Sequence, residues 1–288
     1  MPHLDSLISS LDRTDVDMLV ASIPIPPRPS LLSDLQCELD RPEPNLKLVA
    51  RVVEKDVALA GAFMKTVNSA FFRCVRKVET IEAALTRLGL NQVTLLAGGF
   101  LVKQSFQGKN FELTNFWEQS SLRSTAMAYL ARELRAGSPD LARSFGLFAD
   151  LGMPLLMERF DDYPQVLKLA QAKPHRSLAE IEDEHYGTNH AVIGALLARN
   201  WQLPDEVVAA IQLHHDHSVL MSSQWELPIR RLIALSILSD IFIQHYMGQG
   251  TNGSAEQGAA LAMDELEVSS EELRDLDSVL REIFSQDN

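Results

Sequence analysis

Three histidines gather around an aspartate near the end of an apolar stretch of the sequence. His214, His215 and His217 flank Asp216 in the segment AAIQLHHDHS. Imidazoles and carboxylates are common ligands of divalent transition metals, so the segment indicates a metal site. Imidazoles at the C-terminus of a helix also donate to free carbonyl groups and interact favourably with the helix dipole. The sequence favours this structural role and leaves a metal site as the alternative.

The expected position of these histidines at the end of a helix limits how they could bind a metal. Leu203-Pro204-Asp205 predicts the start of that helix, because proline is well placed in a first turn. Adjacent residues of an α-helix point about 100° apart. We therefore expect that His214 and His215 do not both bind one ion, although they could flank two.

Capping residues and apolar residues at helical spacing recur along the chain and predict an all-α fold. No segment shows sustained alternation with a period of two, which a half-buried strand would require. Met247 to Gln257 predicts a flexible loop, because it is rich in glycine and polar residues. The start and stop signals of the expected helices are Thr80 and Gly89 around IEAALTRL, Gly137 and Ser138-Pro139, the capping boxes Ser177–Glu180 and Ser269–Glu272, and Pro228 for a helix to about Met247.

Two polar residues, Asn68 and Ser69, interrupt an apolar helix end. Side chains of this kind hydrogen-bond readily to nearby backbone groups. We predict that they satisfy backbone groups where the helix stops, and a ligand contact is the alternative.

Composition is typical of a globular protein with one large domain or two small ones. The chain has 288 residues, of which 46% are hydrophobic and 23% charged. Cys37 and Cys74 are isolated, so we expect small core residues rather than a disulfide framework or a zinc ribbon. The N-terminal residues lack the features of a signal peptide, and no apolar run approaches about 18 residues. These observations predict a cytoplasmic protein that does not interact with membranes.

Charge is unevenly distributed along the chain. The net charge of −13 argues against nucleic-acid binding. Residues 57–111 nevertheless contain seven Lys/Arg against two Glu, while residues 250–288 contain ten acidic residues against two Arg. Within the basic segment, Arg73, Arg76 and Lys77 directly follow Phe71-Phe72. Basic groups beside aromatic rings can bind an anionic ligand or an acidic partner, so these three are candidate partner-binding residues. A solvated face is the alternative.

Several segments together resemble the HDOD domain family. NLKLVARVVEKDVALAGAFMKTVNSAFF and VETIEAALTRLGLNQVTLL carry the first part of the resemblance. FWEQSSLRSTAMA, SFGLFADLG and the stretch from HYGTNHAV to LHHD continue it, so that it covers roughly Pro24 to Val219. The resemblance implies a multi-helix bundle related to HD-type metal-dependent phosphohydrolases. It also implies a bacterial signalling protein that lacks the catalytic residues.

The same resemblance implies which metal ligands are missing. An HD phosphohydrolase uses a histidine, an adjacent His-Asp pair and a distant aspartate. Here Gln119 stands at the first position, Ala149-Asp150 at the pair, and Asp240 at the distant position. Because two histidines are replaced, we expect no catalytic residues and no cofactor. The vestigial metal candidates are Asp150, His190, His214, His215 and Asp240, and a residual divalent metal at Asp150, His190 and His214 or His215 stays open.

The sequence thus predicts an all-α, HD-domain-like bundle in three parts. Residues 1–22 form an N-terminal helical extension, 23–220 the HDOD domain, and 221–288 C-terminal helices with an acidic tail. The expected function is non-catalytic signal transduction through binding of a protein partner or a small anionic ligand, without nucleic acid or membrane. The alternative is a metal-dependent phosphohydrolase acting on a nucleotide or cyclic dinucleotide. The oligomeric state is not fixed by the sequence.

Overall fold

The protein is helical and contains no strand in the part that the structure describes, which confirms the predicted fold class. This computed structural model describes residues 34–35, 37–38, 41, 43–54, 57–68, 78, 80–89, 92–93, 96–97, 112–173, 176–200, 203–248 and 253–287. The expected N-terminal helical extension lies outside them. The chain divides into two compact units, Met1–Pro26 with Phe111–Leu280 and Pro27–Asn110 with Arg281–Asn288. The three-part division predicted from the sequence stays a prediction.

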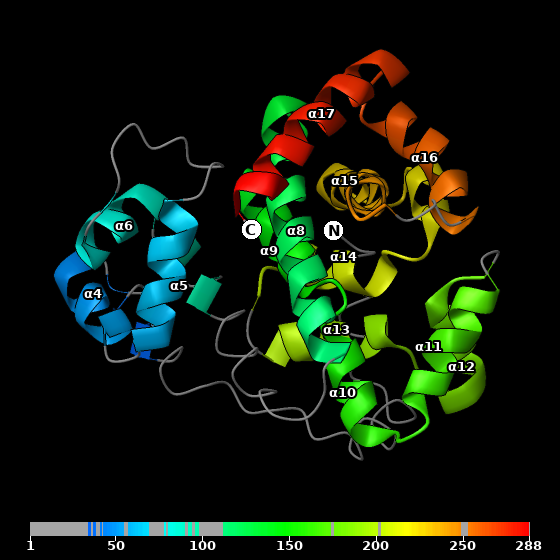
Figure 1. Ribbon diagram of the computed structural model, residues 1–288, viewed down its shortest axis with the longest axis horizontal. Helices are drawn as coiled ribbons and strands as arrows, with labels where there is room; N and C mark the ends of the chain where they lie inside the picture. Colours follow the sequence, from blue (N-terminus) through cyan, green and yellow to red (C-terminus); the bar gives the residue numbers. More distant parts are fainter. Residues whose placement is uncertain are drawn as a thin grey trace. The chain divides into compact units, whose positions relative to one another are not determined.

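The smaller unit is built on three short helices that pack against one another: α4 (Leu46–Glu54), α5 (Val57–Val67) and α6 (Ile81–Leu88) (Figure 1). Its core contains the fully buried side chains of Val53, Leu59 and Leu85. Thr80 accepts a hydrogen bond from the backbone of Ala83, and Gly89 ends α6 with a positive φ of 79°. The predicted limits of this helix are therefore confirmed.

Asn68 closes the chain segment between α5 and α6. Its amide nitrogen donates to the carbonyl of Val78 at 3.0 Å, and its amide oxygen accepts from the Val78 nitrogen at 2.7 Å. The predicted structural role of Asn68 is confirmed, whereas Ser69 lies outside the described residues. Cys37 is exposed, which corrects the expectation of a core thiol. The core-facing side of this short helical segment is taken by Leu35, which is fully buried.

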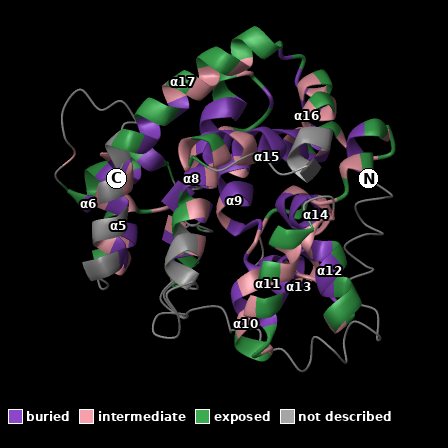
Figure 2. Ribbon diagram, turned by 45° about the vertical axis from the view of Figure 1, so that its right-hand side comes forward, coloured by how far each residue is buried: buried purple, intermediate pink, exposed green. Residues whose placement is uncertain are grey.

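The larger unit is organised around helix α15 (Leu227–Tyr246), which packs against α8 (Glu112–Glu133), α9 (Pro139–Phe148) and α16 (Gly253–Glu265) (Figure 1). Figure 2 shows α15 largely in the colour of buried residues, while α17 (Ser270–Asp287) carries a long exposed face. Within the described residues, no helix combines the length and the apolar character that crossing a membrane requires.

The remaining helices of this unit place the residues near the histidines. Helix α10 contacts α13, α13 contacts α14, and α11 and α12 form a further pair. Their bounds are α10 (Gly152–Arg159), α11 (Tyr163–Ala172), α12 (Leu178–Tyr186), α13 (His190–Asn200), α14 (Asp205–Leu213) and the 3-10 helix η2 (His217–Met221).

The capping signals of the sequence are found where they were predicted. Ser177 and Glu180 form a reciprocal capping box at the start of α12, and Ser269 and Glu272 form the same hydrogen bonds before α17. The loop predicted for Met247 to Gln257 is wrong at its end, because α16 already begins at Gly253. The Ala, Glu and Gln residues after Ser254 are favourable helix formers, which explains the early start.

Helices α10 and α13 meet at backbone contact, and a glycine makes this possible. A Cβ atom on Gly152 would lie 2.0 Å from the carbonyl oxygen of His190. No flexible side chain could move aside, because the obstructing atom belongs to the backbone. Gly152 therefore allows the first turn of α13, and His190 with it, to lie directly beside the first turn of α10.

We expect Gly152→Ala to destabilise the fold by about 3 kcal/mol, the upper end of the usual cost of overpacking. Gly187→Ala is the matched control, since Gly187 has a positive φ of 68° but open space at its Cβ position. Backbone strain alone costs about 1 kcal/mol at such a position. Urea unfolding of both variants would measure the two costs. An equal or smaller loss for Gly152→Ala would contradict the close contact.

Candidate functional site

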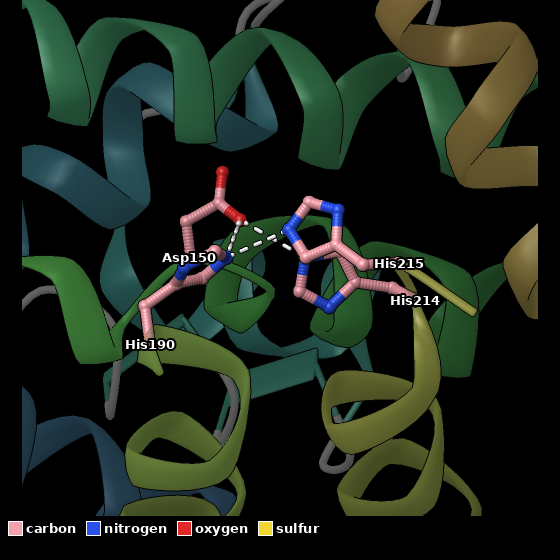
Figure 3. Close-up of side chains that lie close together, drawn as sticks. All are labelled: Asp150, His190, His214 and His215. Carbon is pink, nitrogen blue, oxygen red and sulfur yellow. Dashed lines mark hydrogen bonds and ion pairs between the residues drawn. The ribbon is translucent and has the colours of Figure 1, made fainter. Parts of the chain in front are cut away.

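Four side chains that are distant in the sequence converge in the larger unit (Figure 3). Asp150 lies in the turn between α9 and α10, and His190 is the first residue of α13. His214 and His215 follow the last residue of α14. Each of the four offers a ligand atom within 4.8 Å of the others. The structure thus brings together four of the five vestigial metal candidates.

His214 and His215 reach the same point because the helix has already ended. Helix α14 stops at Leu213, and the two histidines lie in the turn that follows. Their ring centroids are 3.9 Å apart. The two rings thus lie closer together than the 100° rotation between adjacent helical residues suggested, and the expectation that they do not both bind one ion stays a prediction.

His214 combines the capping role expected for this segment with a bare nitrogen. Its Nδ1 lies 2.7 Å from the carbonyl oxygen of Ile211, so Nδ1 carries the hydrogen and donates it. Its Nε2 lies 3.3 Å from Asp150 Oδ1. Nε2 is buried and makes no hydrogen bond with any residue that the structure describes. The lone pair of Nε2 is thus directed into the cluster.

His190 is held by a buried carboxylate on the side away from the cluster. Its Nδ1 lies 2.6 Å from Glu182 Oε2, and its backbone nitrogen donates to the same oxygen at 2.8 Å. The hydroxyl of Tyr163 donates to the other oxygen of Glu182. Burial lowers the pKa of His190, but Glu182 raises it further, so the net shift is upward. The surroundings of His190 therefore favour the protonated, positively charged form of its ring.

A guanidinium occupies the other side of Asp150. Nη1 of Arg123 lies 2.6 Å from Asp150 Oδ2, and its Nε lies 2.7 Å from Asp240 Oδ1. Burial alone would raise the pKa of Asp150, but Arg123 holds it well below its usual value. Burial also raises the pKa of Asp240, and here Arg123 compensates only in part. Asp150 therefore stays ionised, with one oxygen on Arg123 and the other facing the imidazoles.

The surroundings of His215 favour the neutral form of its ring. Burial, followed by the neighbouring His214 and His190, places its pKa well below the ordinary value for histidine. Its Nε2 lies 2.8 Å from Nε2 of His190. Two nitrogens at this distance share one hydrogen or direct both lone pairs toward a common cation.

The other residues singled out in the sequence lie elsewhere. The amide nitrogen of Gln119 lies 3.9 Å from Met247 Sδ, and Arg123, one turn later on α8, is the residue that contacts the carboxylates. Ala149 is buried and supplies no ligand atom. His217 packs beside Gly258 rather than in the cluster. The candidate partner-binding residues Arg73, Arg76 and Lys77 lie outside the described residues.

Sequence reasoning missed Arg123, Glu182 and Tyr163. A signal existed for Arg123, because it lies four residues after Gln119 and so on the same face of the helix. Glu182 lies in the acidic run EIEDEHY, which is typical of a solvent-exposed helix, yet its side chain is fully buried. Only the packing of α12 against α13 shows its contact with His190.

We expect Arg123→Met to destabilise the protein strongly at neutral pH. Removal of one partner from a buried ion pair costs about 3–5 kcal/mol, and the partial exposure of Asp240 reduces this figure here. Urea unfolding in the presence of a chelator would measure the loss without a metal replacing the guanidinium. Adding Asp150→Asn and Asp240→Asn to Arg123→Met should restore part of the stability. No recovery in the triple variant would contradict an electrostatic origin.

Two curated relatives of this chain come from bacteria. An uncharacterized protein of Treponema pallidum (strain Nichols) is 29% identical over 217 residues, which cover 71% of this chain and 41% of that protein. The uncharacterized protein YuxH of Bacillus subtilis (strain 168) is 25% identical over 178 residues, which cover 60% and 42%. The chain thus spans about two fifths of the length of these relatives.

Solved structures share the fold. An HDOD domain protein with unknown function from Geobacter sulfurreducens superposes with a TM-score of 0.69 at 18% identity, covering 94% of this chain and 98% of that one. A "Putative phosphohydrolase" from Shewanella amazonensis SB2B gives 0.67 at 20% identity, with coverage of 94% and 98%. A "Putative signal transduction protein" from Marinobacter aquaeolei VT8 gives 0.67 at 22%, with 98% and 63%. At these identities the likeness establishes the fold alone.

The family itself is established by the sequence match. The model of the HDOD domain matches residues 25–217, about two thirds of the chain. This range includes Asp150 and the three clustered histidines. The predicted resemblance is confirmed, and the chain belongs to the HDOD domain family.

Proposed function

We propose that this chain is a non-catalytic bacterial signal-transduction protein of the cytoplasm, in which the HDOD domain binds a protein partner or a small anionic ligand. The observation that carries the proposal is the guanidinium of Arg123 between Asp150 and Asp240. These are the two carboxylates that remain from the ligand set of an HD phosphohydrolase.

Arg123 does not replace a catalytic metal in chemical terms. A hydrolytic metal polarises the substrate and lowers the pKa of a bound water, and it needs an open coordination position to do so. A guanidinium is permanently protonated and offers only hydrogen-bond donors. It can neutralise the carboxylates and hold their helices together, but it cannot generate a hydroxide nucleophile. Ala149 removes a further ligand from the same place.

The second candidate function is a metal-dependent phosphohydrolase acting on a nucleotide or cyclic dinucleotide. The observation that favours it is the group of Asp150, His190, His214 and His215. The solved relatives carry names of both kinds, a phosphohydrolase and a signal transduction protein, so their names do not separate the candidates. A direct assay of hydrolysis does.

We expect no metal-stimulated hydrolysis of cyclic dinucleotides, nucleotides or p-nitrophenyl phosphate by the full chain. The assay adds Mg²⁺, Mn²⁺, Fe²⁺ or Zn²⁺ and compares the wild type with Asp150→Ala. Asp205→Ala is the control, because Asp205 is an exposed residue at the start of α14. Metal-dependent turnover that persists in Asp205→Ala and disappears in Asp150→Ala would establish the second candidate.

We also expect the basic residues after Phe72 to contribute to partner binding, because positive charge on an acidic chain steers acidic surfaces. Reversal of Arg73, Arg76 and Lys77 to Glu should reduce the amount of protein captured from a bacterial lysate, without loss of thermal stability. The control reverses three exposed lysines elsewhere, Lys47, Lys168 and Lys173. Equal capture by both variants, measured by quantitative mass spectrometry at low and moderate salt, would show that the basic residues are an ordinary solvated face.

A further inference from the structure

We infer that Asp150, His190, His214 and His215 together bind one transition-metal ion of the Zn²⁺ type in a closed, structural site. The four residues present one oxygen and three nitrogens, a set that suits zinc better than Mg²⁺ or Ca²⁺, which prefer oxygen ligands. This inference goes beyond the proposed function and does not require it.

The distances between the ligand atoms fit a small tetrahedral ion. Asp150 Oδ1 lies 3.3 Å from Nε2 of His214 and 3.6 Å from Nε2 of His190. Nε2 of His190 and Nε2 of His215 are 2.8 Å apart. Zinc–nitrogen and zinc–oxygen bonds of about 2.0–2.1 Å place tetrahedral ligands about 3.3 Å from one another. These three separations lie on both sides of this value, and all four ligand atoms lie within 4.8 Å of one another, so a bound ion would draw the side chains closer together.

The nitrogen of His214 gives an independent reason for a ligand at this point. Nε2 is buried and has no hydrogen-bond partner among the described residues, while Nδ1 is fixed by the Ile211 carbonyl. A buried polar atom without a partner costs free energy. The tautomer that this contact selects is the one in which Nε2 can bind a metal.

The surroundings of His190 are those of a metal-binding histidine. Histidine ligands usually donate the other ring hydrogen to a carboxylate or carbonyl, which fixes the ring and increases its basicity. Glu182 accepts from Nδ1 of His190 and is itself fixed by Tyr163 and by the backbone nitrogen of His190. Nε2 of His190 is thereby directed toward Asp150.

The charges of the site also favour a divalent cation. Asp150 and Asp240 both contact the guanidinium of Arg123, whereas the third carboxylate, Glu182, contacts His190. With neutral imidazoles, two negative charges are left without a counter-charge within this group, and a divalent ion balances them. Arg123 takes only Oδ2 of Asp150 and leaves Oδ1 for the ion.

Four protein ligands make the site closed. A tetrahedral ion bound in this way keeps no position for water, which is the arrangement of structural rather than catalytic zinc. The ion would join the turn before α10 to the start of α13 and the end of α14. We therefore expect bound metal to stabilise the fold without hydrolysis.

The experiment titrates the chelator-treated full chain with Zn²⁺ and measures bound metal by elemental analysis, thermal unfolding, and the visible absorption of a Co²⁺ derivative. A Cys37→Ser, Cys74→Ser background removes both thiols as competing ligands. We expect one ion per chain, a higher Tm with metal, and the strong absorption typical of tetrahedral Co²⁺. His214→Ala and His215→Ala should each weaken binding by about 100-fold or more, and Glu182→Gln by about 10- to 100-fold.

His217→Ala is the matched control, because His217 belongs to the same sequence segment but lies outside the cluster. It should bind metal like the wild type.

His215 is only partly buried, so His215→Ala remains informative if His214→Ala fails to fold. Absence of stoichiometric metal, or equal binding by the wild type and His215→Ala, would overturn the inference. Absence of both metal and turnover overturns this inference alone. Bound metal with turnover supports the four ligands but contradicts a closed site, and it also overturns the proposed function.

Discussion

The ion pairs of Arg123 with Asp150 and Asp240 are the interaction on which the site depends. They join α8, the turn between α9 and α10, and α15, three segments that are far apart in the sequence. Without the guanidinium, two partly buried carboxylates would repel each other. With it, Asp150 stays ionised and is fixed in one orientation. The contact of Arg123 with Oδ2 of Asp150 therefore also positions the remaining carboxylate oxygen, Oδ1.

The two carboxylate oxygens of Asp150 face different groups, so the site has two halves with different chemistry. On the side of Oδ2 the counter-charge belongs to the protein and is permanent. On the side of Oδ1 three imidazoles converge, one of them bare at Nε2 and another held by Glu182. The proposed loss of hydrolysis concerns the half with Arg123, whereas the proposed metal ion would bind in the other half.

The sequence predicted the helices well, because their limits depend on local chemistry. Thr80, Ser177 and Ser269 cap helices through contacts that span three residues. The four candidate ligands were also identified, and the resemblance left open a site of Asp150, His190 and one of the two adjacent histidines. That both His214 and His215 lie in the cluster was not expected. Contacts between segments that are distant in the sequence could not be predicted from local sequence patterns. Arg123 and Glu182 look like surface charges until the packing of α8, α12, α13 and α15 is known.

The backbone contact between Gly152 and His190 has a mechanical consequence for the two helices that it joins. Side-chain contacts can absorb a small displacement by changing rotamers, but two backbones in contact have no such freedom. A displacement of α10 is therefore expected to displace the first turn of α13 as well. The contact couples α10 to the residue that carries one of the four clustered side chains, His190.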